Sequence, residues 1–160
     1  MTSIEIRDAM PEDCGTLLQL VRELAAYERA PDAVVATEAD LRRDGFGSER
    51  RFEARLAILD GRAAGFTLFF PNYSTWEGRA GLYLEDLFVA EWARGHGLGR
   101  RLIADLAAIA LARGWRRLEL SVLDWNPARG FYKALGFEHK QEWLGYRLTG
   151  AALETLARER

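Results

Sequence analysis

The chain has 160 residues, 49% of them hydrophobic and 29% charged, which is the composition of one globular domain, so we expect a single domain over residues 1–160. Its formal net charge of −2 provides no concentrated basic face, which argues against nucleic acid as a partner. One cysteine and two histidines exclude a disulfide framework and a zinc cluster of the usual spacing, and no apolar run approaches the roughly 18 residues of a membrane span. We therefore expect a cytoplasmic protein with no metal and no membrane partner.

The N-terminal quarter predicts a strand followed by two helices. Residues 4–7 alternate as a half-buried strand does, and Pro11 then opens a helix with apolar positions at helical spacing. Thr37 and Asp40 have the spacing of a capping box with Asp in place of Glu. Gly45 is placed to end the short helix that this box begins.

A run of strands comes next. Residues 52–59 and 64–70 flank Asp60-Gly61-Arg62, and an Asp-Gly pair between two apolar runs predicts an antiparallel hairpin. Residues 71–78 read as a polar loop with exposed aromatic side chains, and 82–89 as another apolar-rich strand.

A glycine-rich segment then leads into an amphipathic helix over about 102–111, which ends near Gly114 and is followed by a strand over 118–123. Strand, helix and strand in this order predict a crossover between two parallel strands. The segment at 94–100 then lies at the carboxyl end of the first strand, which is where α/β sheets bind ligands. The remaining chain predicts a helix over 126–135, a pair of strands within 137–148 and a short helix over 151–157.

The glycine-rich segment has the composition of a diphosphate-binding loop. A helix start presents unpaired backbone N–H groups and a partial positive charge, and glycine lets an anion approach them. The spacing fits neither the dinucleotide fingerprint nor a P-loop, and a tight turn without a ligand is the alternative on spacing alone. The predicted donor-binding residues of this loop are Arg94, Gly95, His96, Gly97, Leu98, Gly99 and Arg100.

Two segments together resemble the GNAT superfamily of acetyltransferases. Arg94-x-x-Gly97-x-Gly99 after a strand is similar to its coenzyme A signature, and Asn126 to Phe137 is similar to its Asn, Phe-Tyr and Gly-Phe segment, with one residue fewer between Asn126 and Tyr132. The runs 23–28, 37–47 and 83–89 resemble the diamine (spermidine/spermine) and thialysine N-acetyltransferases. The similarity covers about residues 4–148.

This resemblance implies an α/β, three-layer fold with a mixed, twisted, seven-stranded sheet flanked by helices, acetyl-CoA as the donor, and a homodimer. It also implies a bulge in strand 82–89 that splays the central strands. The bulge would leave backbone groups of Leu87, Phe88 and Val89 free to bind the pantetheine arm and polarise the thioester. Asn126 and Tyr132 would contact the cofactor as well.

Acetyl transfer from a thioester to an amine requires a neutral amine, a polarised carbonyl and a proton for the departing thiolate. The resemblance implies that Tyr132 is the acid, whereas the residues alone leave a packing role equally open. Glu85 is the predicted base, acting through a water. Adjacent strand residues face opposite ways, so only one of Glu85 and Asp86 should face the site unless a bulge intervenes, and Asp86 is the alternative base.

The predicted acceptor surface is acidic and aromatic, which suits a cationic amine through charge pairing and cation–π contact. Its members are Tyr27, Glu28, Trp76, Glu85 and Asp86. Glu28 or Trp76 taken alone is more often ordinary surface. The segment Arg29-Ala30-Pro31-Asp32 stands where the polyamine enzymes are acidic after the Tyr-Glu pair. Ser74-Thr75 precede Trp76 where those enzymes carry an acid, so a short amine or an amino acid is at least as plausible an acceptor as a long polyamine.

Two other functions remain open. A non-catalytic acyl-CoA-binding domain would need the loop but none of Tyr132, Glu85 and Glu28, so their presence favours an enzyme. An acetyltransferase of protein N-termini or lysines would use the same acidic site.

Overall fold

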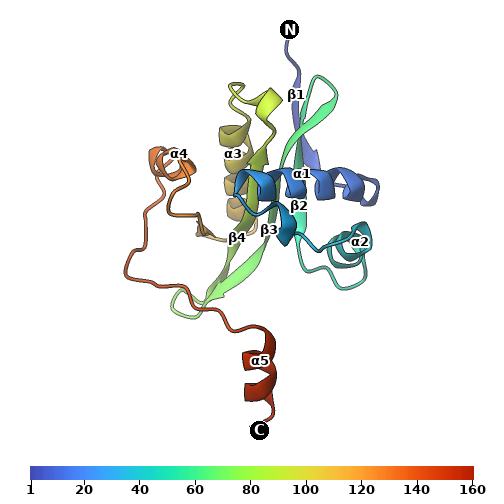
Figure 1. The fold of residues 1–160 in the computed structure, drawn as a ribbon. Coiled ribbons are helices and arrows are strands. Elements are labelled where there is room, and N and C mark those ends of the chain that lie inside the picture. The colour runs from blue at the N-terminus through green and yellow to red at the C-terminus, as the bar shows by residue number, and fades with distance from the viewer. The chain divides into compact units, whose positions relative to one another are not determined.

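The computed structural model describes residues 1–160 (Figure 1). Residue contacts divide them into an N-terminal unit, Met1–Asn126, and a C-terminal unit, Pro127–Arg160. The expectation of one domain across both units stays a prediction.

A mixed sheet forms the centre of the N-terminal unit. Its strands, in spatial as in chain order, are β1 (Ile4–Asp8), β2 (Glu53–Leu59), β3 (Arg62–Ser74), β4 (Arg79–Val89) and β5 (Leu118–Leu120). The first three pairings are antiparallel and β4 pairs with β5 in parallel. The predicted mixed sheet and its parallel crossover are confirmed, but the sheet has five strands and not seven.

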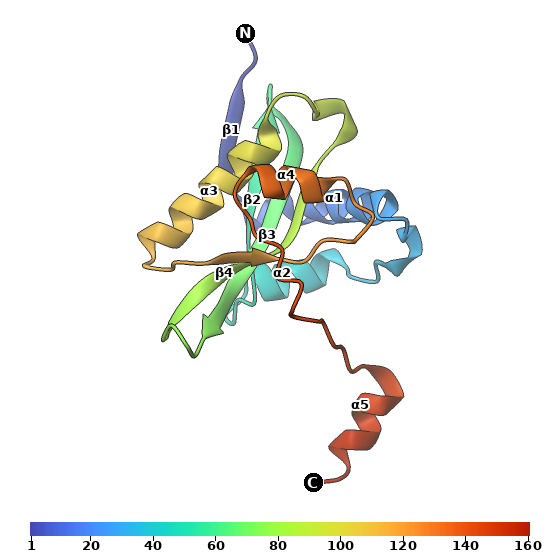
Figure 2. The same ribbon diagram turned by 90° about the vertical axis from the view of Figure 1, so that its left-hand side faces the viewer.

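Helices cover both faces of this sheet, which gives the three predicted layers (Figures 1 and 2). One core cluster joins the sheet to α1 (Cys14–Tyr27) and α2 (Glu38–Phe46). A second cluster joins the sheet to α3 (Leu98–Ala112). Single-turn 3-10 helices η1 (Pro11–Asp13), η2 (Pro31–Ala33) and η3 (Glu91–Ala93) complete the unit. Each long helix buries one apolar stripe, because helical spacing places residues three and four apart on one face.

Two local predictions are confirmed in detail. The Thr37 side chain accepts from the backbone N–H of Asp40 at 3.2 Å, and the Asp40 carboxylate accepts from the backbone N–H of Thr37 at 2.9 Å, which completes the capping box. Asp60 and Gly61 both have positive φ, 49° and 80°, as the two-residue turn of the β2–β3 hairpin requires.

Three boundaries differ from the sequence prediction. Helix α2 runs through Gly45 to Phe46 and is capped by Gly47; a Cβ on Gly45 would come within 2.6 Å of the Phe52 ring, so Gly45 allows close packing and does not end the helix. Strand β3 continues to Ser74, because β4 offers it a partner as far as Arg79. Strand β5 ends at Leu120, where its pairing with β4 ends.

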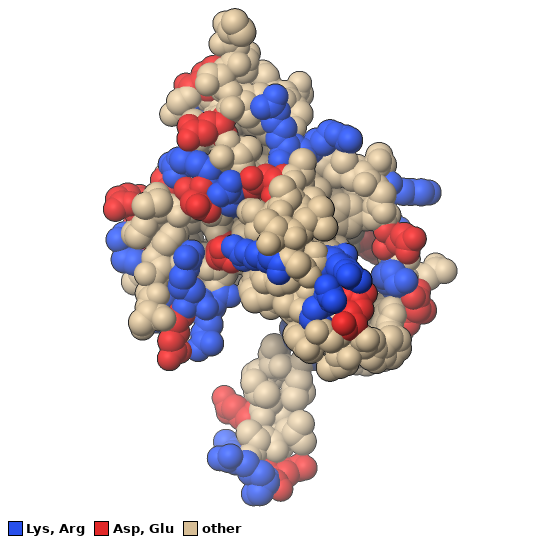
Figure 3. Space-filling view, turned by 180° about the vertical axis from the view of Figure 1, so that it is seen from behind, with Lys and Arg blue, Asp and Glu red and all other residues tan.

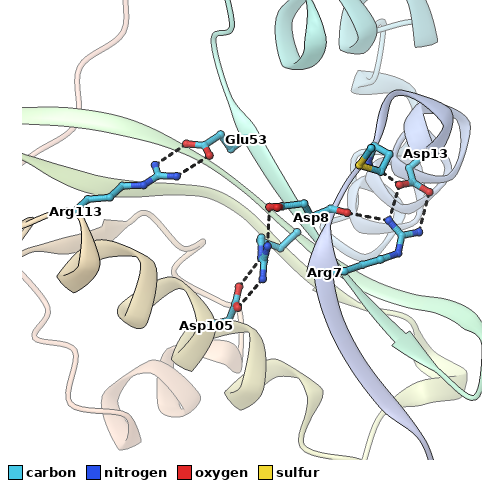
Figure 4. Close-up of polar contacts among 8 residues, drawn as sticks. Arg7, Asp8, Asp13, Glu53, Asp105 and Arg113 are labelled. Atoms are coloured by element: carbon cyan, nitrogen blue, oxygen red, sulfur yellow. Dashed lines mark hydrogen bonds and ion pairs between the residues drawn. The ribbon is translucent and has the colours of Figure 1, made fainter.

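Charged side chains fasten α3 to the neighbouring strands (Figure 4). Arg55 on β2 donates to both carboxylate oxygens of Asp105 on α3, at 2.8 and 2.9 Å, and to Asp8 on β1 at 2.6 Å. Arg113, just after α3, makes a two-point pair with Glu53 on β2 at 2.7 and 2.8 Å. These planar pairs fix the position of the helix along the sheet.

The C-terminal unit contains α4 (Ala128–Ala134) and α5 (Gly150–Ala157). Their bounds differ by no more than two residues from those of the helices predicted over 126–135 and 151–157. The pair of strands predicted within 137–148 is wrong: no strand forms there. A strand exists only where a neighbouring strand takes its backbone hydrogen bonds, and this segment has no such partner in the structure. Several of its apolar side chains are exposed, among them Trp143 (69%), Leu144 (75%) and Tyr146 (93%).

No helix of the structure has both the length and the apolar character needed to cross a bilayer. In the view from behind, basic and acidic side chains are interspersed and do not form a field of one sign (Figure 3).

Candidate functional site

The glycine-rich loop joins β4 to α3 through η3 and is shaped by two left-handed residues. Gly95 and Gly97 have φ of 87° and 72°, and Gly97 is the N-cap of α3. A Cβ at either glycine would meet no heavy atom within 4 Å. These glycines therefore serve backbone conformation, and they leave open space above the first N–H groups of a 15-residue helix, where an anion is stabilised.

Buried apolar residues anchor the glycine-rich loop, and the loop also carries polar side chains. Ala93 and Leu98 are buried at 0% and 2% exposure. The guanidinium of Arg94 donates through Nε to the carbonyl oxygen of Val89 at 3.2 Å, and Nδ1 of His96 donates to the carbonyl oxygen of Ala93 at 3.1 Å. Arg100 is exposed at the start of α3. The loop thus holds fixed positive charge beside a helix N-terminus, as a diphosphate requires.

Strand β4 carries the bulge that the resemblance implied. Leu68 of β3 pairs with Asp86, while the next residue, Phe69, pairs with Leu84, so Glu85 is the extra residue. On its other side, β4 pairs with β5 only over Leu82–Leu84. From Glu85 to Val89 no strand lies along that edge, and the sheet is splayed there.

The backbone of β4 beyond the bulge is the part available to a ligand. Phe88 is buried in the core shared with α1, and Leu87 and Val89 pack against the core shared with α3. Their side chains are therefore structural, and any contact they make to a ligand at the open edge comes from backbone N–H and C=O groups.

The bulge changes the choice between the two acids. Glu85 is exposed and Asp86 is half-buried. Burial first, and then the charges of Glu85 and Glu28, raise the pKa of Asp86 to about 6, and burial raises the pKa of Glu28 above its usual value. The strict alternation of strand side chains that favoured Glu85 does not hold at a bulge. Position along the strand therefore no longer decides which of the two acids faces the site.

The end of α1 lies beside these acids and beside the loop. The Tyr27 hydroxyl is 3.5 Å from Oδ1 of the buried Asn126, and the Arg94 guanidinium carbon lies 5.1 Å from the centre of the Tyr27 ring. The Trp125 and Tyr27 rings are 6.3 Å apart, and the Arg29 guanidinium carbon lies 3.9 Å above Trp125. We call these five residues the Tyr27–Trp125 cluster.

Trp125 was not among the site residues predicted from the sequence. It immediately precedes the Asn126 of a recognisable segment, but no periodicity or spacing connects it with Tyr27 or Arg29 at the other end of the chain. Only the meeting of α1 with the segment after β5 brings these residues together.

Trp76 is not part of this cluster in the structure. It lies in the turn between β3 and β4 and is 90% exposed. Six strand residues separate the start of β4 from Glu85, a distance of about 20 Å at the usual rise per residue. Within one chain, Trp76 and the acids do not form one surface.

Tyr132 lies on α4 in the C-terminal unit and is half-buried. Its ring makes edge-to-face contacts with Phe131 and Phe137, with centroids 5.2 and 5.5 Å apart. The aromatic packing that the sequence left open is present in this unit, and it holds the ring in a defined orientation.

Comparison with known proteins agrees with this geometry. The model of the acetyltransferase (GNAT) family matches residues 17–137, a range that includes β4, the loop, α3 and Tyr132. The thialysine N-epsilon-acetyltransferase of Bos taurus is 41% identical over 169 residues, covering 98% of this chain and 99% of that protein. The L-ornithine N5-acetyltransferase NATA1 of Arabidopsis thaliana is 31% identical over 198 residues, covering 94% and 86%.

Among solved structures, an integron cassette protein from the mobile metagenome of V. cholerae superposes with a TM-score of 0.82 at 30% identity, covering 98% of both chains. The family match spans most of the chain, and the relatives match it over nearly its whole length. The chain therefore belongs to the GNAT family of acetyltransferases and is an enzyme that N-acetylates amines.

Proposed function

We propose that the protein transfers the acetyl group of acetyl-CoA to a primary amine of a small cationic substrate by direct attack. The observation that carries this proposal is that Glu28, at the end of α1, interacts electrostatically with Asp86. Asp86 adjoins Glu85 where β4 parts from β5, and β4 leads from there into the glycine-rich loop. An acidic surface attracts an ammonium group, and the loop offers positive charge for the diphosphate of the donor.

Acetyl-CoA uses three parts of the chain in this proposal. Arg94 to Arg100 hold the diphosphate at the N-terminus of α3, and the backbone of Leu87, Phe88 and Val89 binds the pantetheine arm and polarises the thioester carbonyl. Asn126 and Tyr132 complete the donor site. The residues supply binding and electrostatic stabilisation without a metal ion.

The reaction begins when the substrate ammonium loses a proton. Asp86 pairs with the ammonium group before this step. Glu85, which solvent reaches, then accepts the proton through a water. The neutral nitrogen then attacks the thioester carbon, the carbon–sulfur bond breaks, and the thiolate of coenzyme A takes the phenolic proton of Tyr132. The new amide nitrogen loses its second proton, which returns the Tyr132 phenolate to the phenol. Asp86 is the alternative base, and its raised pKa supports that role, because a base with a pKa near 6 is still ionised at neutral pH.

The names of the relatives support a small acceptor. They act on thialysine and on L-ornithine, and both molecules present a primary amine on a short flexible arm. Diamines and polyamines share that group. Tyr27 and Trp76 are the aromatic members of the proposed acceptor surface, although Trp76 of the same chain lies far along β4 from the acids.

We propose a homodimer in the cytoplasm. The exposed apolar side chains Trp143, Leu144 and Tyr146, with Leu153 and Leu156 of α5 at 51% and 56% exposure, support an association surface, because covering them with a partner would remove apolar area from water. The single buried cysteine suits a reducing compartment.

A coupled assay tests the function. Purified protein with acetyl-CoA should release free coenzyme A only when an amine is added, and a panel of thialysine, ornithine, putrescine and spermidine should rank the acceptors. Binding of acetyl-CoA without turnover of any amine would instead support an acyl-CoA sensor. Turnover of a peptide that free amines do not inhibit would support a protein acetyltransferase.

A further inference from the structure

Arg29 occupies a backbone conformation that favours glycine. The backbone N–H of Ala30 donates to the carbonyl oxygen of Ala25 at 2.8 Å, and that of Arg29 donates to Ala26 at 3.1 Å. These two bonds form a Schellman motif at the end of α1, with Arg29 in the left-handed position at φ 63°. Glycine is the usual residue there because it lacks a Cβ, so arginine at this position carries backbone strain that glycine would avoid.

The Arg29 side chain has a defined place. Its guanidinium carbon lies 3.9 Å from the centre of the Trp125 ring, so the flat face of the cation stacks on the indole. Stacking uses the face of a guanidinium and leaves its N–H edge available. None of the ion pairs of the structure involves Arg29, so this edge presents hydrogen-bond donors that no carboxylate satisfies.

Acidic groups lie near the positive charge of Arg29. Glu28 precedes it and interacts electrostatically with Asp86, which in turn adjoins Glu85. A negative group that suits an ammonium and a fixed positive edge that suits a carboxylate therefore lie at the same end of α1. A diamine complements only the first of these, whereas an amino acid with a side-chain amine complements both.

We propose that Arg29, held on Trp125, binds the carboxylate of the acceptor and makes the enzyme selective for amino acids with a side-chain amine over diamines and polyamines. This inference rests on the proposed function and specifies its acceptor. Arg29 is a specificity residue, and it takes no part in proton transfer. A second ammonium group of a polyamine would meet its positive charge and be repelled.

The experiment compares two acceptors that differ only in the carboxylate: L-thialysine and its carboxamide. In the wild-type enzyme, kcat/KM should favour the acid by roughly tenfold or more, because a paired ionic group is lost in the amide. Arg29→Gln should remove most of this preference by lowering kcat/KM for the acid alone. Arg29→Lys should restore part of the preference, and Arg29→Glu should reverse it, so that kcat/KM becomes higher for the carboxamide than for the acid.

Three controls make the result decisive. Arg22→Gln removes an equal charge from an exposed position on the same helix and should leave the preference unchanged. Arg29→Gly should keep the protein folded with an equal or higher Tm, yet show the same loss of preference. The KM for acetyl-CoA should stay constant in all variants.

Turnover of both acceptors with an unchanged ratio in Arg29→Gln would overturn the proposal and leave the acetyltransferase function intact. A change confined to the KM of acetyl-CoA would also overturn it, because it would place Arg29 at the donor. Failure of the wild type to acetylate any amine would contradict the proposed function itself, and with it this inference.

Discussion

Asp86 carries its negative charge at a cost in stability. Its pKa in the folded protein, about 6, lies above the ordinary value of 3.8, so between these values the folded protein binds the proton more tightly than the unfolded chain. Stability contributed by this group is therefore lost as the pH rises through about 4 to 6, and the full cost applies above pH 6.

Asp86→Asn should remove that cost. We expect the free energy of unfolding at pH 7.5 to rise by about 1 to 3 kcal/mol, from roughly two pKa units at 1.36 kcal/mol each, and the gain to vanish near pH 4. Urea denaturation at both pH values measures it. Glu85→Gln, at the exposed neighbouring acid, should give a smaller gain, because it removes only one of the charges that raise the pKa of Asp86. A loss of stability at pH 7.5 would mean that the charge of Asp86 has a partner that stabilises it.

The same two variants separate the base from the residue that holds the amine. If Glu85 is the base, Glu85→Gln should lower kcat by roughly 10²-fold with little change in amine KM, whereas Asp86→Asn should act mainly through amine KM. Steady-state kinetics with saturating acetyl-CoA measure both. The reverse distribution would assign proton transfer to Asp86.

The phenolic hydroxyl of Tyr132 can be tested separately from the packing of its ring. Tyr132→Phe keeps the contacts with Phe131 and Phe137 and removes only the phenolic proton. Turnover should fall by roughly 10²-fold or more, while the affinity for acetyl-CoA stays close to that of the wild type. Stopped-flow turnover and calorimetry of donor binding measure the two effects, and an unchanged rate would rule out Tyr132 as the acid.

At the level of elements, the loop before α3 combines a backbone requirement with open space. Gly97→Ala places a Cβ at φ 72° without touching any neighbour. We expect a loss of about 1 kcal/mol in stability from the left-handed conformation, together with weaker binding of acetyl-CoA, because the methyl group occupies the space above the helix N-terminus.

Gly78→Ala is the matched control for this loop. Gly78, in the β3–β4 turn, has φ 65° and is equally uncrowded. The variant should lose similar stability and bind acetyl-CoA normally. Equal affinity for acetyl-CoA in the two variants would remove the loop from the donor site.

The attachment of α3 to the sheet can be tested in the same way. Asp105→Asn breaks a pair whose side chains are 16% and 20% exposed and should lower the free energy of unfolding by about 1 to 3 kcal/mol. Glu49→Gln breaks the Arg51–Glu49 pair, which is 71% and 80% exposed, and should cost about 0 to 0.5 kcal/mol. Similar losses in both variants would show that partial burial of the Arg55–Asp105 pair does not increase its contribution to the free energy of unfolding.

At the scale of the whole molecule, several apolar side chains within residues 143–156 are exposed to solvent in a single chain. If a second copy covers them, light scattering should give twice the mass of 18.1 kDa, and Trp143→Ser with Leu144→Ser should shift the protein toward monomer. A wild-type monomer at tens of micromolar would contradict the homodimer.

Much of the fold was predictable because it is encoded locally. The Thr37–Asp40 box and the Asp60–Gly61 turn depend on residues a few positions apart, and the structure has both. Helix α3 was predicted over about 102–111 and forms, but it starts earlier, at Leu98. The ends of β3 and β5 and the strands expected within 137–148 depend on a partner strand elsewhere in the chain, and there the prediction erred.

The sequence by itself determined the GNAT family and the glycine-rich loop before α3, and it indicated the acidic residues proposed for the amine, because motifs of fixed spacing specify a backbone conformation and a chemistry. Tertiary structure alone decided which acid is half-buried, where β4 parts from β5, and that Arg29 stacks on Trp125. Burial, electrostatic coupling and stacking arise between residues that only the folded chain brings together, and local spacing carries no record of them.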